Sequence, residues 1–269
     1  MVRSTPILGA LLTTLLATTA QAATIGYWRM EQDIQPGPNL RVANEFAGGS
    51  DLRSNNAFID TNLPTTSVPQ TGTPNLGSIG STSAGGTDGI NASAAAYSAL
   101  NVSSITVEFW ARTVENEAEL FMRSSGNNGI IIDQPSDLRV RWWVDDGAGG
   151  AEEREMAGLF DMDAAWNHFA FSYDHLTGVA EFFVDGTSVG TDNGTAGRAL
   201  VWDTNEAVQI GLRMDFAAAN NGTMDEVRID DSALRALELL SSPEPGTGTM
   251  LALGLVGLGL RGRRARRKR

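Results

Sequence analysis

The sequence predicts an all-β fold, a two-sheet antiparallel β-sandwich, and three observations support this prediction. Apolar and polar residues alternate with a period of two over 105–112, 138–145 and 168–173, as expected for strands with one buried face. Turn sequences such as Asp185-Gly186 separate the predicted strands. No helical segments alternate with them, which excludes a parallel α/β fold.

The alternation also predicts which side chains face the core. The polar residues between them are expected to face water, so that each strand has one wet face. Further strands are predicted over 179–184, 208–212 and 223–229, and only 232–240 has a helical pattern, of about two turns. The predicted inward residues are Ile105, Val107, Phe109, Ala111, Leu138, Val140, Trp142, Val144, Phe169, Phe171 and Tyr173.

Composition and charge exclude several classes of function. The 269 residues contain no cysteine, so disulfides, thiol catalysis and thiolate metal sites are excluded. Seven of the 20 basic residues lie in the last nine positions, and residues 23–242 hold 12 basic and 31 acidic residues. A surface of this charge repels phosphate backbones, so we expect no nucleic-acid partner.

The first 22 residues have the pattern of a cleaved secretory signal peptide. One basic residue precedes an apolar run over 7–17, and Ala20-Gln21-Ala22 gives the small residues that signal peptidase requires. An amphipathic or buried first helix is the alternative, but the run has no polar stripe. We therefore expect a short signal helix, cleavage after Ala22 and export across a membrane.

The last 27 residues form a second terminal signal. Pro243-Glu244-Pro245 is followed by an apolar stretch over 250–260 and then by the arginine cluster. The stretch is short for a membrane-spanning helix, and the cluster would hold its end on the cytoplasmic side. A basic nucleic-acid-binding tail is the alternative, but such tails do not normally follow an apolar run. We expect a C-terminal apolar helix that inserts into the membrane.

This order of triplet, apolar helix and terminal arginines resembles the PEP-CTERM sorting tail of Gram-negative bacteria that secrete exopolysaccharide. The resemblance implies recognition by an exosortase, a membrane-embedded cysteine peptidase or transpeptidase, that cuts near Pro243, Glu244 and Pro245. The ectodomain would then be released or transferred, and would reside at the cell surface, the outer membrane or the extracellular matrix. In this chain the three residues would act only as substrate.

The remaining 23–242 form one predicted domain with a loop-rich insertion at about 55–93. Glycine, proline, serine and threonine dominate this part of the chain, which predicts long loops or poor order. Residues 92–100 suit either a short helix or a strand that enters the sheet.

The domain resembles the laminin-G-like, concanavalin A-like jelly-roll superfamily. The resemblance spans about 25–240 and implies a jelly-roll sandwich, whereas it gives no ligand, because such domains bind glycans, proteins or nothing measured. The landmark segments are 25–31 (IGYWRME), 105–110 (ITVEFW), 166–174 (WNHFAFSYD), 182–186 (FFVDG) and 222–229 (GTMDEVRI).

The sequence favours a non-catalytic protein. Glycanases on related jelly rolls need paired carboxylates, and no Glu-x-Asp-x-x-Glu motif is present. Glu152, Glu153 and Glu155 follow a glycine-rich stretch and are expected in a solvated hairpin. His168 lies in a predicted strand, where a structural hydrogen bond is expected, and His175 lies in a turn.

A structural Ca²⁺ ion is a second expectation, because hard cations can tie the loops of exported sandwiches that lack disulfides. Asp225 has the parity of Val227 and Ile229, so its carboxylate is predicted to point inward, where it needs a partner. The partner is Ca²⁺, with loop N–H groups or an arginine as the alternative, and the sequence leaves this open. A second acidic group consists of Asp133, Asp137, Asp145 and Asp146.

Two tryptophans are candidates for sugar stacking. Trp143 shares its parity with Arg139 and Arg141, and Trp110 shares its parity with Glu108 and Arg112. An aromatic ring beside planar polar groups suits sugar recognition. The alternative is that one of the two rings is covered by the opposite sheet or by the insertion.

We therefore predict an exported, exosortase-sorted, non-catalytic surface or matrix protein that binds carbohydrate or exopolysaccharide. A structural or adhesive protein that makes protein–protein contacts is the first alternative, and a divergent glycan hydrolase or lyase is the second. Its expected partners are signal peptidase, exosortase, polysaccharide or matrix components and, before processing, the membrane.

Overall fold

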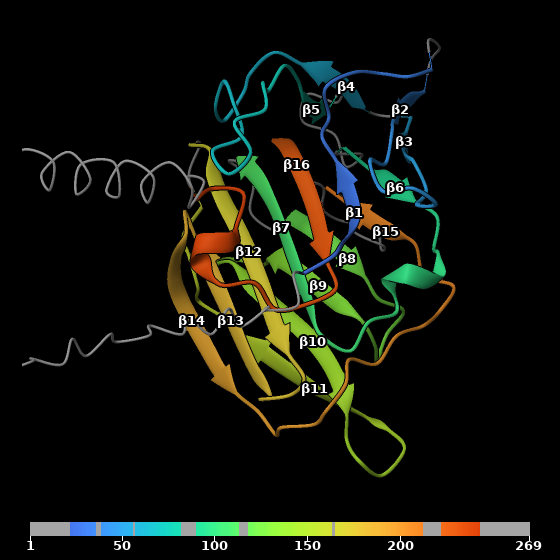
Figure 1. Cartoon of the computed structure of the whole chain (residues 1–269), viewed down its shortest axis with the longest axis vertical. Helices are drawn as coiled ribbons and strands as arrows, with labels where there is room; N and C mark the ends of the chain where they lie inside the picture. The colour runs from blue at the N-terminus through green and yellow to red at the C-terminus, as the bar shows by residue number, and fades with distance from the viewer. Residues whose placement is uncertain are drawn as a thin grey trace, which may run out of the picture.

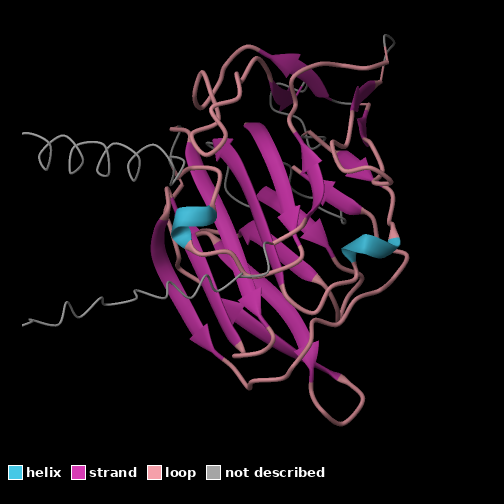
Figure 2. Ribbon diagram, in the orientation of Figure 1, coloured by secondary structure: helices cyan, strands magenta, loops and turns pink. Residues whose placement is uncertain are grey.

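The computed structural model describes residues 22–35, 39–55, 57–81, 90–112, 118–162, 165–211 and 222–242. Within these ranges, sixteen strands form two antiparallel sheets of eight strands each, which face one another as a sandwich (Figure 1). The two-sheet, all-β prediction is confirmed. The only helices of this part are two single 3-10 turns (Figure 2), and no described helix is long and apolar enough to cross a membrane.

Sheet 1 has the strand order β14-β13-β12-β7-β16-β5-β4, and β1 also pairs with β16. β14 therefore ends the sheet on one side. The strands of sheet 1 are β1 Thr24–Trp28, β4 Ala57–Asp60, β5 Ser78–Ser81, β7 Ile105–Arg112, β12 Asn167–Asp174, β13 Val179–Val184, β14 Thr187–Asn193 and β16 Thr223–Asp230.

Sheet 2 has the order β11-β10-β9-β8-β15-β6-β3-β2, so β11 ends it on the same side of the sandwich as β14 ends sheet 1 (Figure 1). Its strands are β2 Leu40–Val42, β3 Leu52–Ser54, β6 Ala92–Ala94, β8 Ala118–Arg123, β9 Ile130–Gln134, β10 Arg139–Asp145, β11 Ala151–Met156 and β15 Val208–Ile210.

The predicted inward faces form the core between the sheets. Val107 and Phe109 of β7 and Phe171 of β12 are fully buried. Val140 and Trp142 of β10 are at most 1% exposed. Burial of a side chain of this size stabilises the folded state by roughly 1.5–3 kcal/mol. The hairpin after β13 also forms as predicted, since Asp185 and Gly186 both have positive φ, as a type I′ turn requires.

The prediction of one wet face per strand is wrong for the central strands β7, β12 and β16 of sheet 1. Its outer face carries Thr106, Glu108, His168 and Arg228, and each of these is at least 92% buried. Two segments cover this face, 66–76 and 231–242, and Leu239 of the second packs on side chains of β12 and β13. A polar outer face can be buried here because its groups hydrogen-bond to the covering segments.

The predicted helix over 232–240 is also wrong, since only Ala236–Glu238 forms a single 3-10 turn, η2. Besides the bond of the 3-10 turn, from Glu238 N–H to the Arg235 carbonyl, the backbone of this segment bonds to side chains of β7. Leu234 N–H donates to Thr106 Oγ1 at 2.7 Å, and Leu240 N–H donates to Glu108 Oε2 at 2.8 Å. These bonds require an extended backbone and stop the helix.

The loop-rich part of the chain contributes more strand than predicted. β4 and β5 form a hairpin on sheet 1, and β6 joins sheet 2. Residues 92–100 contain both alternatives, because β6 is followed by the 3-10 turn η1, Ser98–Leu100. Residues 56 and 82–89 lie outside the described part.

Candidate functional site

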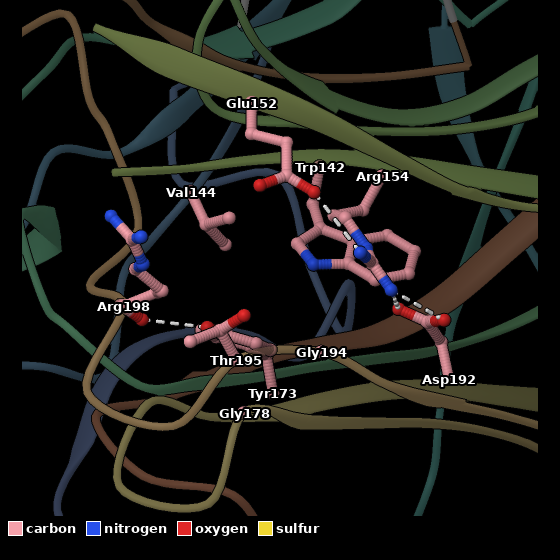
Figure 3. A pocket seen from close by; sticks show the side chains of 10 residues that line it. All are labelled: Trp142, Val144, Glu152, Arg154, Tyr173, Gly178, Asp192, Gly194, Thr195 and Arg198. Atoms are coloured by element: carbon pink, nitrogen blue, oxygen red, sulfur yellow. Dashed lines mark hydrogen bonds and ion pairs between the residues drawn. The ribbon is translucent and has the colours of Figure 1, made fainter. Parts of the chain in front are cut away.

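A polar hollow lies at the open edge of the sandwich, where β11 of sheet 2 faces β14 of sheet 1. It encloses about 230 Å³, counted with the solvent space that is open to it. Figure 3 shows its side chains gathered from both sheets and from the loop after β14. We call it the edge pocket. It is lined by Trp142, Val144, Glu152, Arg154, Tyr173, Gly178, Asp192, Gly194, Thr195 and Arg198.

Strand alternation places the charged side chains of the edge pocket. Glu152 pairs with Val144 and Arg154 pairs with Trp142, so both point to the inner side of sheet 2. Asp192 pairs with the buried Ala180 and points inward from sheet 1. Charged residues are tolerated on these inner faces because β11 and β14 are edge strands, where the core opens to water.

The charged side chains join the two sheets. Arg154 donates to both oxygens of Asp192, from Nη2 to Oδ1 at 2.7 Å and from Nε to Oδ2 at 3.0 Å. It also donates to Glu152 Oε1 at 3.0 Å. The hydrogen bonds to Asp192 and Glu152 raise the pKa of Arg154 above its usual value. We call the Arg154–Asp192 pair the edge clasp.

Two aromatic residues form the floor. Trp142 is 1% exposed and its ring packs against Phe171 at 5.2 Å between centroids. Tyr173 donates from its hydroxyl to the carbonyl of Arg198 at 2.6 Å, and burial raises the pKa of Tyr173 to about 12, so it stays neutral. The indole Nε1 of Trp142 is buried and has no hydrogen-bond partner among the described residues.

Gly178 lets the loop after β14 close the pocket. Its φ is +75°, and a Cβ at this position would lie 2.5 Å from the backbone carbon of Thr195. Any other residue would therefore push the 194–198 loop away from the β12–β13 turn. This close approach brings Thr195 and Arg198 to the wall of the edge pocket.

The edge pocket offers chemical groups that can bind a polar molecule. Its ten lining residues include no histidine and no serine, so a nucleophile with an adjacent histidine base is missing from this site. Its acids, Glu152 and Asp192, are both bonded to Arg154. What it offers is hydrogen-bond donors and acceptors above an aromatic floor, which suits a polar, uncharged molecule.

The group around Trp143 lies on the outer face of sheet 2, as its parity predicted. Arg139 and Arg141 both reach Asp133, at 2.6 and 3.1 Å, and form an ion-pair cluster. Trp143 itself is only 3% exposed and packs with Met122 and Ile131. In this arrangement the ring has no open face for a sugar, because aliphatic neighbours cover it.

Trp110 lies on the outer face of sheet 1, on the opposite side of the molecule from Trp143. Its ring is partly exposed and meets the ring of His168 edge-on at 5.0 Å. His168 Nε2 lies 2.9 Å from Glu108 Oε2, so the structural role predicted for His168 is confirmed. The structure thus does not bring the two predicted tryptophans together.

Asp225 does not point toward the interior with Val227 and Ile229, and the parity argument was wrong. A β-bulge at Glu226, which has a φ of +49°, places Asp225 opposite Trp110 on the outer face of sheet 1. The carboxyl is still fully buried, beneath Asn75, whose Nδ2 donates to it at 2.7 Å. Sequence alternation cannot predict such a bulge.

Asp225 lies next to a second buried acid, Glu226. Burial and the neighbouring Glu226 raise the pKa of Asp225 well above its usual value, and burial raises the pKa of Glu226 to about 7. Glu226 accepts from the hydroxyl of Tyr27 and pairs with Arg29 at 3.5 Å. Among the described residues, no three His, Asp or Glu side chains are grouped so that they could hold a metal ion.

The second acidic group is not brought together either. Asp133 is paired with arginines, and Asp146 accepts from the backbone N–H groups of Ala148 and Gly150. Of the predicted signal-cleavage residues, Ala22 packs beside the apolar cluster under 231–242, and Ala20 lies outside the described residues. Pro243, Glu244 and Pro245 also lie outside them.

Sequence reasoning missed the edge pocket. It assigned Glu152 to a solvated hairpin, and both it and Glu153 are indeed exposed on β11. A usable signal was present: Arg154 and Glu152 have the same parity as the buried Met156. Charged residues on the inward face of a strand indicate an edge that opens to water or to a ligand.

Comparison with known proteins agrees with this architecture. The family model described as "Concanavalin A-like lectin/glucanases superfamily" matches residues 84–239, more than half of the chain. No curated protein matches the sequence.

Solved structures share the fold at low identity. The binding domain of Paraclostridial mosquitocidal protein 1 matches with a TM-score of 0.57 and 13% identity, over 81% of this chain and 51% of that one. The binding domain of botulinum neurotoxin DC, solved with rat synaptotagmin II, gives 0.53 and 11%, over 81% and 51%. The chain thus spans about half the length of these toxin domains.

This chain aligns with almost the whole length of a third solved structure. It is domain 4 of the extracellular arabinanase AbnA from Geobacillus stearothermophilus, solved in complex with arabinotriose. The TM-score is 0.54 and the identity 12%, over 82% of this chain and 97% of that domain. At these identities the likeness shows the fold alone.

Proposed function

The chain belongs to the concanavalin A-like lectin/glucanases superfamily, and from this premise we propose that it is a non-catalytic carbohydrate-binding protein that uses the edge pocket. The observation that carries the proposal is the pocket itself, with Glu152, Arg154 and Thr195 above the floor formed by Trp142. Hydroxyl-rich ligands need such donors and acceptors beside apolar surface.

The structures of similar fold support binding as the activity. Two of them are named as binding domains of toxins, and the third was solved with arabinotriose. The toxin domain bound to synaptotagmin also supports the alternative of an adhesive protein that contacts other proteins. A divergent glycan hydrolase or lyase is the weaker alternative, because the edge pocket holds its two acids in ion pairs.

A binding array with the purified full-length chain tests the proposal. Glu152→Gln removes the charged acceptor at the pocket rim and should weaken glycan binding by about tenfold. Glu153→Gln, one residue along β11 on the opposite face, is the matched control and should bind as the wild type does. Equal binding by all three would remove the pocket from the proposal, and binding of no glycan would favour the adhesive alternative.

We further propose that the protein is exported by signal peptidase and sorted by exosortase to the surface or matrix of a Gram-negative bacterium. The support is the order of sequence signals at the two ends, namely Ala20 and Ala22 after an apolar run, and Pro243-Glu244-Pro245 before one. The C-terminal helix would hold the unprocessed chain in the membrane.

Structural calcium at Asp225 is a separate proposal. Its support is the concentration of negative charge in a buried place, since Asp225 and Glu226 are both fully buried and adjacent. The fit is incomplete, because Asp225 already accepts from Asn75 Nδ2 and from the Glu226 N–H at 2.8 Å. A direct measurement of stability with and without calcium decides it.

A further inference from the structure

We infer that the edge pocket binds a neutral sugar through one hydroxyl group that accepts a hydrogen bond from the indole N–H of Trp142. This inference rests on the proposed carbohydrate-binding function and names the ligand class and the donor.

Trp142 carries the inference. A buried donor without an acceptor costs about as much as a lost hydrogen bond, so buried indole N–H groups are normally bonded. Trp142 is 99% buried, yet its Nε1 has no partner among the described residues. In Figure 3 this nitrogen faces the open centre between Val144, Thr195 and Arg198. The missing acceptor can therefore come from a ligand.

The charges of the pocket favour a neutral ligand. Arg154 is already bonded to Asp192 and Glu152, so its charge is compensated. Arg198 Nη1 lies 3.8 Å from a carboxylate oxygen of Asp145. The two arginines and two acids of the lining balance, while residues 23–242 as a whole are strongly acidic. A polyanionic glycan would be repelled without finding an uncompensated cation.

The size favours a single hydroxyl group. The edge pocket as a whole leaves room for little more than one water-sized group. A whole sugar ring therefore stays at the rim, near Glu152 and Thr195. A hydroxyl group is suited to the inner position because it accepts from Trp142 and can donate in turn to a neighbouring oxygen.

The test compares Trp142→Phe with the wild type in titrations of neutral and of uronate-containing oligosaccharides. Phenylalanine keeps an aromatic ring but removes the N–H, so the affinity for the neutral ligand should fall about tenfold. Trp143→Phe is the matched control, because Trp143 is similarly buried on the opposite face of the same strand, and it should leave the affinity unchanged.

A spectroscopic readout guards against a variant that misfolds. In the wild type, the ¹⁵N-indole resonance of Trp142, assigned through the Trp142→Phe spectrum, should shift when a neutral oligosaccharide is added, and that of Trp143 should not. A second variant, Thr195→Val, keeps the floor intact and should reduce the affinity by a few fold.

The outcomes separate this inference from the proposed function. Loss of binding in Glu152→Gln with unchanged binding in Trp142→Phe and a static Trp142 resonance would leave the function standing and overturn the inference. It would mean that a water satisfies the indole. Preference for uronate-containing ligands would also overturn it, and absence of all glycan binding would remove both.

Discussion

Arg154 of β11 and Asp192 of β14 join the two sheets of the sandwich at its open edge, with both carboxylate oxygens bonded at 2.7 and 3.0 Å. The two side chains are 27% and 25% exposed. Water screens a pair of this exposure, so it contributes little to stability. Because it joins the two walls of the edge pocket, we expect its main effect to be on the pocket rather than on stability.

Asp192→Asn should therefore reduce glycan affinity more than stability. We expect a loss of less than about 1 kcal/mol in the free energy of unfolding, measured in urea, and a several-fold loss of glycan affinity. Asp51→Asn is the control, because Asp51 pairs with Arg41 at similar exposure but far from the pocket. A binding loss of equal size in both variants would contradict the assigned role of the clasp.

Glu108→Gln should be strongly destabilising. Glu108 is fully buried and accepts from Arg228 Nε at 2.6 Å and from the Leu240 N–H. Burial alone would raise the pKa of Glu108, but Arg228 and His168 hold it below the usual value. Breaking such a buried pair costs about 3–5 kcal/mol. Urea unfolding measures the loss.

The exposed Glu155 gives the control for this measurement. Its side chain is 44% exposed and its nearest cation lies 3.6 Å away, so Glu155→Gln should change stability by less than about 0.5 kcal/mol. If Glu108→Gln behaved in the same way, the covering segment 231–242 would not be held by Glu108.

The sequence was sufficient to predict the two sheets of the sandwich. It was insufficient to predict which segments cover their outer faces. Alternation along β7, β10 and β12 predicts the inner faces because a strand has a fixed period of two. It cannot show that 231–242 folds back over sheet 1, since that depends on bonds between residues more than a hundred positions apart, such as Leu240 and Glu108.

Strand alternation was also insufficient to predict the candidate site. The parity of Trp143 is correct, but a ring on an outer face can be covered by its own neighbours, as Met122 and Ile131 cover it. At Asp225 one added residue in the strand reverses the parity. The edge pocket arises from the meeting of β11 and β14, which no local pattern specifies.

Asp230 should make stability depend on pH. Burial raises the pKa of Asp230 from 3.8 to about 6, so the folded state keeps a proton that the unfolded state releases. The contribution of Asp230 to the free energy of unfolding is fully present below about pH 4 and decreases as the pH rises toward 6. Asp230→Asn imitates the protonated group and should remove this part of the slope.

Urea unfolding between pH 4 and 7 measures the difference between the wild type and Asp230→Asn. Asp231→Asn is the control, since Asp231 is partly exposed and accepts from the Ala23 N–H at 2.9 Å and from the Ser232 hydroxyl at 3.4 Å. A wild-type slope that survives in Asp230→Asn would assign the pH dependence to other acids.

Calcium, if Asp225 binds it, should raise the melting temperature. A ligand at a hundred times its Kd adds about 2.7 kcal/mol to stability, which corresponds to roughly 5–10 °C for a domain of this size. Thermal unfolding of the full-length chain with calcium and with EGTA measures this shift, and Asp225→Asn should abolish it. An identical melting temperature in both buffers would leave Asp225 as a buried carboxyl bonded to Asn75.

Removal of the C-terminal tail should leave the domain folded, because the described chain is fixed on sheet 1 up to its last residues. Leu239 is fully buried in the cluster on sheet 1, and the Ser242 N–H donates to the Leu239 carbonyl at 3.0 Å. A cut within 243–245 falls just beyond this packing. In cells that contain exosortase, the mature protein should therefore end near Pro243–Pro245 and melt as the full-length chain does. Mass spectrometry gives the C-terminus: a secreted form that still contains Arg269 contradicts the sorting proposal, whereas an end before Leu239 contradicts the packing argument, since it would uncover Glu108.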